Sequence, residues 1–376
     1  MLLPFDKDDT TMTRADDIAL KRVRVRDFLR SHDLGGVLFT QQKSFSWYTS
    51  GGQNHVGLTT EAGAAHLLAT PDQDYLVANN IEAPRIMDEE GLSELGIQPL
   101  VYQWDSPETD ATRLVERVLA GQRYATDTGQ FAGELNHLRY SLTPVEVERY
   151  RALGKDCAEV MSDLCLAVEP GQTEWEVAAA LSKRLWEREI VPAVVLVAAD
   201  DRISKYRHPI PTANKIAKYV MVVMCGRRHG LILSTTRLVH FGKLPAELKR
   251  KHNAVMRVDA AYIGATLIGA DVDEVFQKGL DVYEETGFKD EWMLHHQGGG
   301  TGYASRDFKG SLHCKERVQA WQAFAWNPSI TGTKSEDTMI ATPDGPEILS
   351  MIRDWPSVEV PAGLWGSLRR ADILVR

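Results

Sequence analysis

Short apolar runs recur through the second half of the chain, each about as long as a β-strand. Glycine, proline or charged residues bound these runs, as is typical of buried strands. Between the runs, the spacing of apolar residues predicts helices from about Ala246 to Ile268 and from about Val272 to Thr286. Strands with helices grouped between them predict an α+β fold with a sheet covered on one side. The strand-like runs are VPAVVLVAA, KYVMVVMCG, LILSTTRLVHFG, QAFAWNPSI and DTMIATPDG.

The first third of the chain has a different pattern. A helix is predicted from about Asp16 to Leu34, closed by the pair Gly35-Gly36, and the buried-strand run GVLFT follows it. The aromatic segment FSWYTSGG then ends in a glycine turn. Helix and strand signals alternate as far as Thr126, which predicts a separate α/β unit.

Two helix starts mark the boundary between these parts. In SLTPVEVERYRALG, Thr143 suits the cap position, Pro144 the first helical position, and Glu146 completes a capping box. In PGQTEWEVAAALSKRL, Thr173 and Glu176 repeat the same signature. We therefore place one domain at residues 1–140 and a second at residues 141–376.

The composition narrows the class of partner. The 376 residues are 43% hydrophobic and 25% charged, and the formal net charge is −9. An acidic chain without clustered Lys and Arg argues against binding to nucleic acid or to an anionic membrane surface. The longest apolar run is too short to span a membrane, and the opening MLLPFDKDDTTMTRADD lacks the apolar core of a signal peptide. We expect a cytoplasmic protein that acts on a small molecule.

Polar residues that could take part in catalysis or binding lie inside the strand-like segments of the second domain. Imidazoles that titrate near neutral pH, together with a carboxylate and an arginine, form a plausible set for proton transfer and anion binding. Each also has a plainer interpretation: a turn for His229, a surface hairpin for Glu336, and a tight turn with buried histidines for LHHQGGGTGY. The candidates are His208, His229, Arg237, His295, His296, Tyr303, Asn327, Lys334 and Glu336.

A bound metal ion is not expected from these residues, and no other cofactor is expected either. A zinc or manganese site needs three or four ligands from His, Asp, Glu or Cys. The adjacent pair His295-His296 would point to opposite faces of a strand, and the carboxylates of this half lie mostly on predicted helices.

The order of the segments is similar to that of a known family. The segments SLTPVEVERYRALG, PGQTEWEVAAAL and EDTMIATPDGPEILS resemble those of the pita-bread fold (peptidase M24), in the branch of creatinase, prolidase and aminopeptidase P. FSWYTSGG resembles a turn in the N-terminal domain of that branch. The resemblance runs from about residue 18 to 350. It implies a creatinase-N-like α/β domain followed by a pita-bread catalytic domain.

The family's metal ligands are where the sequence departs from this pattern. Two aspartates, a histidine and two glutamates hold two metal ions in the metallopeptidases. The resemblance places these five ligands at Met224, at Ser234 or Thr235, and at Gly299, Asn327 and Glu336. Only Glu336 keeps the family's residue type, so the resemblance implies a divergent member that works without the metal pair.

Creatinase is the relative that this pattern resembles, since it cleaves a C–N bond without metal. The resemblance places its histidine at His208 and one of its glutamates at Glu336, whereas its other glutamate corresponds to Thr236, which argues against creatine itself. We therefore predict a metal-independent hydrolase acting on a guanidino, amidine or amide compound.

Each candidate has an expected role in that reaction. His208 would be the general base, Glu336 would pair with a cationic substrate group, and one of His295 and His296 would orient the substrate. Substrate-binding residues complete the set: Arg237 or Lys334 for a carboxylate, Asn327 for an amide or hydroxyl, and also Tyr303 and His229.

Other functions stay open at this point. They are a non-catalytic ligand- or partner-binding protein, as in histone-chaperone relatives of the fold, an Xaa-Pro-type peptidase, and a lyase. Family analogy also implies a homodimer in which Trp47, Tyr48 or Gln53 of one subunit contacts the substrate of the other.

Overall fold

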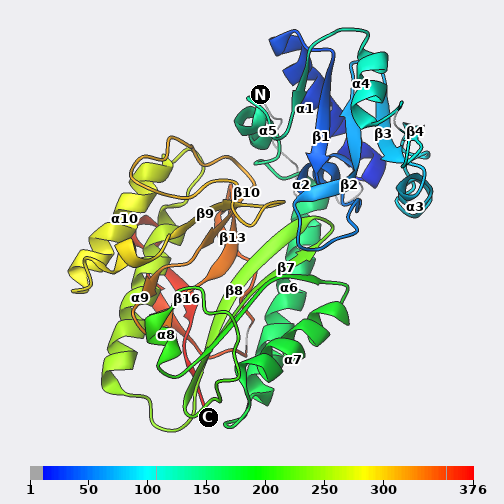
Figure 1. Cartoon of the computed structure of the whole chain (residues 1–376). Coiled ribbons are helices and arrows are strands. Elements are labelled where there is room, and N and C mark those ends of the chain that lie inside the picture. Colours follow the sequence, from blue (N-terminus) through cyan, green and yellow to red (C-terminus); the bar gives the residue numbers. More distant parts are fainter. Residues whose placement is uncertain (1–11, 107, 353) are drawn as a thin grey trace. The chain divides into compact units, whose positions relative to one another are not determined.

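The computed structural model describes residues 12–106, 108–352 and 354–376, and these residues divide into two compact units (Figure 1). The first unit consists of the described residues up to Arg139, with Thr143–Glu148 and His229–Leu231. The second consists of the rest of the chain. Residues 1–11, on which most of the expectation about a signal peptide rests, lie outside the described part.

The first unit is an α/β unit built on a mixed five-stranded sheet in the order β4-β3-β2-β1-β5. Its strands are β1 (Gly36–Gln41), β2 (Ala62–Ala69), β3 (Asp74–Asn79), β4 (Ile97–Tyr102) and β5 (Tyr124–Thr126). Its helices are α1 (Arg14–His32), α2 (Gln42–Tyr48), α3 (Glu82–Glu89), α4 (Ala111–Leu119) and α5 (Ala132–His137). The segment FSWYTSGG thus begins inside helix α2 and ends in a turn at Gly51, whose φ is +91°.

Trp47 and Tyr48 belong to the core of this unit. Each is 1% exposed, and the Tyr48 hydroxyl donates to Asp74 over 3.0 Å. The suggestion that these two rings reach a substrate is therefore wrong, because both are enclosed by their own unit. Gln53 is exposed.

A buried ion cluster ties helix α1 to the start of α6 (Pro144–Ala167). The Lys21 ammonium lies 2.6 Å from Asp17 and 2.7 Å from Glu146, and all three side chains are fully enclosed. Thr143 caps α6 and accepts from the backbone N–H of Glu146, while the Glu146 carboxylate accepts from the backbone N–H of Thr143. The predicted capping box is confirmed, as is the one formed by Thr173 and Glu176.

The second unit is α+β and holds two four-stranded sheets. The order of the first is β17-β8-β7-β6 and that of the second is β14-β13-β10-β9. Thr338 joins them, since its hydroxyl accepts from the Ser234 backbone N–H and donates to the Ser234 carbonyl, each over 2.9 Å. The strands are β6 (Val191–Ala199), β7 (Tyr219–Arg228), β8 (Leu231–His240), β9 (Gly298–Thr301), β10 (Gln322–Trp326), β13 (Asp337–Thr342), β14 (Gly345–Ile348) and β17 (Leu374–Val375).

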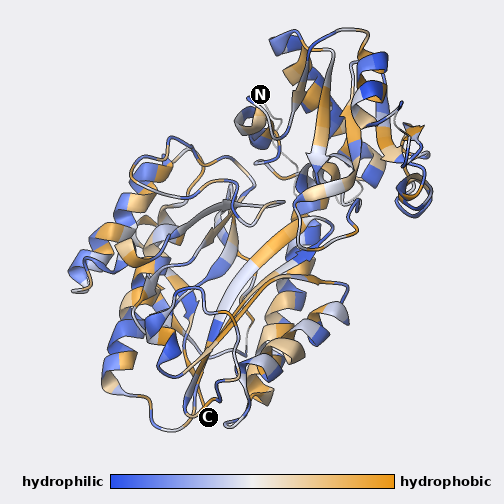
Figure 2. Ribbon diagram, in the orientation of Figure 1, coloured by the Kyte–Doolittle hydropathy of each residue, from blue (hydrophilic) through white to orange (hydrophobic). Residues whose placement is uncertain are grey.

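Helices and two hairpins complete this unit. Helix α7 packs on β6, and α9 packs against α10 and the strands of the hairpins. In Figure 2 these helices are hydrophobic on one side and hydrophilic on the other, as expected when one face covers a sheet. The elements are α7 (Glu174–Trp186), α8 (Arg202–Lys205), α9 (Ala246–Ala265), α10 (Val272–Glu285), the 3₁₀ helices η1 (Glu291–Leu294) and η2 (Gly363–Trp365), and the hairpin strands β11 (Ser329–Ile330), β12 (Thr333–Lys334), β15 (Ser357–Pro361) and β16 (Ser367–Ala371).

The predicted strand QAFAWNPSI is two strands rather than one. The pair Asn327-Pro328 separates β10 from β11, because proline has no N–H to donate to a sheet. Helix α9 ends at Ala265, three residues before the predicted end. The remaining strand-like runs and helices of this half lie where the apolar pattern predicted them.

Candidate functional site

Three of the predicted histidines form one cluster in the second unit. The Nε2 atoms of His208 and His295 are 3.1 Å apart, and the ring centroids of His295 and His296 are 4.7 Å apart. The His208 and His296 rings are 5.6 Å apart. His295 and His296 precede β9 and follow the 3₁₀ helix η1, so they do not alternate across a strand. The expectation that the two rings point to opposite faces of a strand is therefore wrong, and both lie beside His208.

Buried hydrogen bonds hold the turn that carries His295. The Gln297 amide donates to the His295 carbonyl over 2.6 Å, and its oxygen accepts from the Tyr283 hydroxyl over 2.8 Å. The Ser329 hydroxyl lies 3.4 Å from Nδ1 of His295. The His295 ring is thus fixed from both ends, by Ser329 at one nitrogen and by His208 at the other.

An ion pair anchors the segment that carries His208. Arg207 donates to the Glu291 carboxylate over 2.9 Å and to the Thr331 hydroxyl over 2.8 Å. Glu291 opens η1, so this pair joins the backbone beside His208 to the element that leads into His295. The exposed His208 ring is therefore held against a buried partner.

All three imidazoles are held in the neutral form at pH 7. Burial, followed by the positive charge of Lys334, lowers the pKa of His208 and that of His295. Burial and the Arg306 guanidinium lower the pKa of His296 to about 4. Neutral imidazole has a free lone pair, which both a general base and a metal ligand require.

Glu336 is a buried carboxylate that already has cationic partners. It accepts from the Thr236 hydroxyl over 2.6 Å and from the Lys334 ammonium over 2.7 Å, and Nη2 of Arg306 lies 3.5 Å away. Burial alone would raise its pKa, but Lys334 and Arg306 outweigh burial and hold the pKa below its usual range. The carboxylate is therefore ionised and neutralised within the chain.

Arg237 has a structural role in this structure, not the expected role of binding a substrate carboxylate. It is 4% exposed, and it donates to Asp337 over 2.8 Å and to the Ser350 carbonyl over 2.7 Å. Its side chain points into a buried network that joins β8, β13 and β16.

His229 is likewise separate from the cluster. It lies at the turn between β7 and β8, where its φ of +50° is followed by +80° at Gly230. Strand β8 begins at Leu231, two residues after His229, and Thr236, which contacts Glu336, is five residues further along the strand, a distance of about 17 Å at ~3.3 Å per residue. The turn interpretation is correct, and the prediction of a site residue is wrong.

The last two candidates are buried. Tyr303 is 2% exposed and lies just after β9. Asn327 is also 2% exposed, and its Oδ1 has no hydrogen-bond partner among the described residues. A buried amide oxygen without a donor is costly, so Asn327 is suited to accept from a bound molecule.

Two cationic residues of the site were missed from the sequence. Arg306 and Lys309 lie in the loop after β9, and their charges act on His208 and His296. The run SRDFKG follows the glycine-rich segment after one residue, Ala304. The signal available in the sequence was the presence of these basic residues next to glycine-rich backbone, which a ligand can approach closely.

The structure does not fit the two-metal centre of the peptidases. A Cβ atom on Gly299 would lie 2.2 Å from the Phe308 carbonyl oxygen and 2.8 Å from the Gly310 nitrogen. The loop thus fills the space that a histidine side chain at position 299 would need. Ser234 contacts Cys225 over 3.2 Å, and Met224 is buried in β7, so neither position offers a carboxylate.

A single metal ion has a different candidate site. One ligand atom each from His208, His295 and His296 can be chosen so that all three lie within 4.8 Å of one another. Zinc binds histidine nitrogens at about 2.0–2.1 Å, and three neutral imidazoles form a known catalytic ligand set. Among the described residues, Nδ1 of His296 is buried and without a hydrogen-bond partner. This geometry corrects the expectation that the histidine pair is unsuited to a metal.

Comparison with known proteins agrees with the architecture described above. The solved structure of dipeptidase PepE from Mycobacterium ulcerans matches 96% of this chain and 98% of its own, with a TM-score of 0.76 and 18% identity. The Xaa-Pro dipeptidase of Bacillus anthracis also has a TM-score of 0.76, at 16% identity, over 96% of this chain and 100% of its own. The fold is therefore that of the pita-bread dipeptidases and prolidases.

The family model for metallopeptidase family M24 matches residues 148–345, more than half of the chain. The chain belongs to this family. An uncharacterized peptidase of Staphylococcus epidermidis is 21% identical over 233 residues, covering 60% of this chain and 65% of the relative, so the chain spans just under two-thirds of that relative's length. A probable dipeptidase PepE of Mycobacterium tuberculosis is 23% identical over 341 residues, covering 76% of this chain and 90% of the relative.

The fold also occurs in a protein of another kind. The N-terminal domain of the FACT complex subunit SPT16 from chickpea, Cicer arietinum, matches 90% of this chain and 97% of its own, with a TM-score of 0.66 and 10% identity. In the described part of this chain, helices long and apolar enough to cross a membrane were not found.

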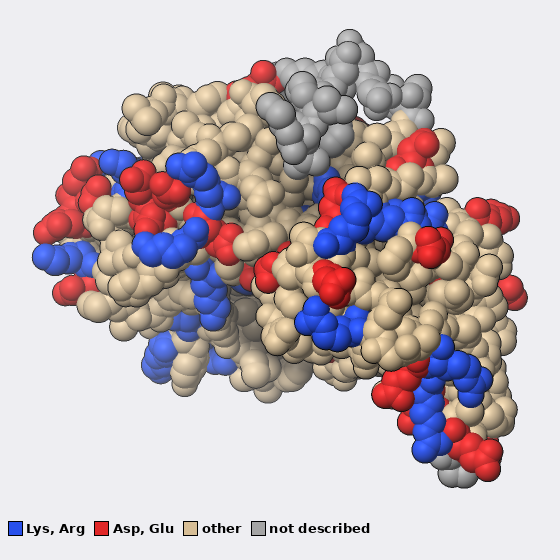
Figure 3. Space-filling model, turned by 90° about the horizontal axis from the view of Figure 1, so that it is seen from above, with Lys and Arg blue, Asp and Glu red and all other residues tan. Residues whose placement is uncertain are grey.

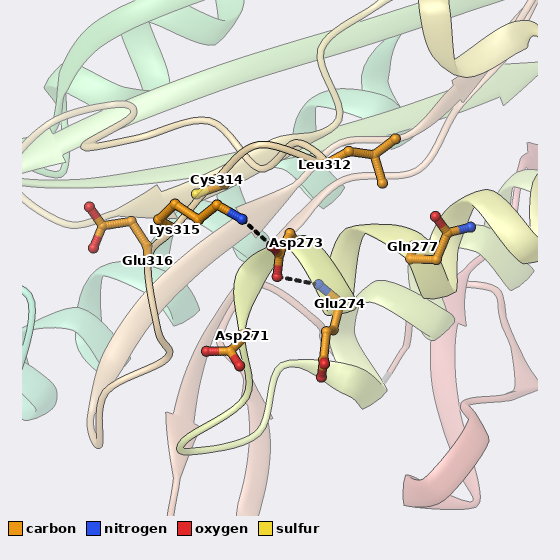
Figure 4. A pocket seen from close by; sticks show the side chains of 8 residues that line it. All are labelled: Asp271, Asp273, Glu274, Gln277, Leu312, Cys314, Lys315 and Glu316. Atoms are coloured by element: carbon orange, nitrogen blue, oxygen red, sulfur yellow. Dashed lines mark hydrogen bonds and ion pairs between the residues drawn. The ribbon is translucent and has the colours of Figure 1, made fainter.

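A cavity of about 530 Å³ lies apart from the candidate residues (Figure 4). Carboxylates from the start of α10 and from the loop at 312–316 line it, and Lys315 pairs with Asp273 over 3.1 Å. None of the predicted site residues is among its lining residues. An acidic cluster by itself identifies no ligand, so the histidine cluster remains the candidate site.

Proposed function

We propose that this protein is a hydrolase that cleaves a C–N bond in a small substrate without the metal pair of the M24 peptidases, as creatinase does. The main support is the neutral His208–His295 pair beside the Glu336, Lys334 and Arg306 cluster. The filled space at Gly299 further supports the loss of the metal pair.

In the proposed reaction, His208 is the general base and then the general acid. The Nε2 atoms of His208 and His295 are 3.1 Å apart, so in this reaction the two neutral rings share one hydrogen bond whose donor is set by the tautomer. His208 takes a proton from water, the water oxygen bonds to the scissile carbon, and the proton passes to the leaving nitrogen as the C–N bond breaks. Such proton transfer contributes typically about 10²–10⁴ in rate.

A product screen by mass spectrometry tests this function. Wild type, His208→Ala and the control His313→Ala, an exposed histidine outside the cluster, are incubated with a chelator and a substrate panel. The panel holds guanidino acids, cyclic amidines, N-acyl amino acids and Xaa-Pro dipeptides. We expect a product from wild type and from the control that is lost in His208→Ala. A product that persists in His208→Ala, or none from any compound, would contradict the proposal.

The three-histidine geometry favours a second candidate, a hydrolase with one metal ion. In that case the product is abolished by the chelator and restored by Zn²⁺. Elemental analysis then finds about one metal per chain in wild type and less in His296→Ala. This outcome would replace the metal-free reaction.

The comparisons guide the choice of compounds and controls. Relatives named dipeptidase and Xaa-Pro dipeptidase support including dipeptides, and the SPT16 domain supports testing a non-catalytic binding role if nothing is cleaved. We also propose a cytoplasmic homodimer, by analogy with creatinase. Light scattering tests this assembly, and a monomeric mass would contradict it.

A further inference from the structure

A second cavity, of about 370 Å³, lies in the first unit. It is formed by the second half of α1, by the two residues that follow this helix, and by the turn between β2 and β3. Ligand pockets typically measure about 300–1,000 Å³, so the cavity is large enough for a small molecule. Its lining residues are Arg26, Leu29, Arg30, Asp33, Leu34 and Pro71.

Arg26 is a partly buried cation of this cavity that has no partner in the described part of the chain, neither a hydrogen bond nor an ion pair. Arg26 and Asp74 both lie close enough to Tyr48 to act on its hydroxyl. The Asp74 carboxylate is occupied, because it accepts from Arg22 and, over 3.0 Å, from the Tyr48 hydroxyl. The Nε atom of Arg26 is enclosed, so its Nη groups are the donors that remain for a bound molecule.

The surface of the molecule does not generally leave cations unpaired. On the face shown in Figure 3, basic and acidic side chains of the described residues lie intermixed. Arg30, the other arginine of the cavity, is exposed and pairs with Asp27 on the same helix. An arginine that lines a cavity without such a pair therefore points to an anionic ligand.

The opposite end of the cavity limits the charge of that ligand. Asp33 is the C-cap of α1, seven residues after Arg26, which is about 10 Å along the helix axis at ~1.5 Å per residue. Its carboxylate and the negative end of the helix dipole both repel an anion there. A single negative charge beside Arg26 is thus favoured, whereas a second one would lack a cationic partner.

The remaining lining residues are apolar. Leu29 lies on α1 between the two arginines, Leu34 follows the C-cap, and Pro71 adds an exposed ring from the turn between β2 and β3. An apolar group that covers these surfaces is stabilised by about 25 cal/mol per Å² removed from water. The ligand that matches the cavity therefore has one anionic end and an apolar body.

We propose that this cavity binds a small monocarboxylate with an apolar body, whose carboxylate accepts from the Nη groups of Arg26. Hydrogen bonds between a guanidinium and a carboxylate are stronger than those between neutral groups. The lining residues all belong to the first unit, and none of them is a residue of the candidate site. The inference is thus independent of the proposed function.

Ligand-observed NMR titration tests the inference without requiring turnover. The probes are the anion 4-methylpentanoate, its neutral isostere 4-methylpentanamide, and inorganic phosphate. We expect 4-methylpentanoate to bind wild type most tightly. In Arg26→Gln its affinity falls by about tenfold to a hundredfold, as expected for a lost charged hydrogen bond. The affinity for 4-methylpentanamide changes little.

Three further variants make the test specific. Arg317→Gln removes the same charge from an exposed ion pair with Asp271, where the side chain is 68% exposed, and it should bind like wild type. His208→Ala should also bind like wild type, because the cavity is separate from the histidine cluster. Arg26→Lys keeps the charge but loses the planar fork, so we expect intermediate affinity. Melting curves confirm that each variant is folded, and Arg26→Lys carries the test if Arg26→Gln does not fold.

The possible results separate this inference from the proposed function. No binding to wild type, equal binding of the carboxylate and its amide, tighter binding of phosphate, or unchanged affinity in both Arg26 variants would overturn the cavity site. Binding lost in His208→Ala but kept in Arg26→Gln would place the anion at the histidine cluster and overturn it as well. Binding lost only in the Arg26 variants upholds the site, whether or not any substrate is cleaved.

Discussion

His208 and Arg306 show how single residues set the chemistry of the site. The imidazole lies 3.1 Å from His295, and after burial the nearby cations lower its pKa. A neutral imidazole at physiological pH is ready to accept a proton, but it is a weaker base than an unperturbed one. The cations thus make His208 a weaker base, but they widen the pH range in which its imidazole is neutral and can accept a proton.

This balance predicts a pH effect for any substrate that is turned over. Because Arg306 lowers the pKa of His208, the acidic limb of kcat/KM should lie below the usual titration range of histidine, and in Arg306→Gln it should move to higher pH. The pH dependence of kcat/KM for wild type and Arg306→Gln measures this, with Arg317→Gln as the control. A limb at the same pH in all three proteins would show that His208 does not set it.

The sequence singled out three histidines that the structure brings together, but it did not separate the surroundings of two arginines. Arg237 and Arg306 both lie among β-rich segments, and nothing local tells them apart. Only the pairing of strands places Asp337 against Arg237, 100 residues along the chain, whereas Arg306 lies near Glu336. Contacts between distant segments decide such roles, so spacing alone could not assign them.

At the scale of elements, local signals predicted the capped helices well and the glycine-rich segment poorly. The capping boxes depend on residues three apart, so the sequence contains the whole motif. Strand β9 depends instead on the loop that packs on it. Gly298 and Gly299 have φ values of +105° and +149°, and neither leaves room for a side chain.

This packing predicts the effect of adding one methyl group. Gly299→Ala should lower the free energy of unfolding of the second unit by about 1–3 kcal/mol, because the new Cβ overlaps the Phe308 carbonyl. Gly133→Ala in helix α5 meets nothing within 4 Å and should be neutral or slightly stabilising. Urea denaturation compares the two. Equal midpoints would mean that the loop moves aside at no cost.

At the scale of the whole molecule, buried ion networks hold elements that lie far apart in sequence. Arg370 donates to Asp259 and, over 2.8 Å, to Asp337, and all three side chains are fully buried. Asp337 also accepts from Arg237. The fold class was predictable from strand runs, capped helices and family resemblance. No local sequence pattern, in contrast, predicts which residues pair in this buried network.

Removing one member of this network should be costly. Arg370→Met leaves the buried Asp259 carboxylate without its cationic partner and Asp337 with Arg237 as its remaining ion pair, and we expect a loss of about 3–5 kcal/mol in stability. The matched change Arg317→Met breaks an exposed pair, for which such losses are about 0–1 kcal/mol. Denaturation midpoints measure both. If Arg370→Met and Arg317→Met have the same denaturation midpoint, the network does not stabilise the fold.

The loop packed on Gly299 limits the routes by which this protein can change. A histidine introduced at position 299 would push aside residues 308–310, next to Arg306 and including Lys309, while Met224, Ser234 and Asn327 carry no charge. A side chain at position 299 therefore displaces the loop that carries Lys309. A designer who wants the two-metal centre of the family must therefore begin by changing the path of this loop.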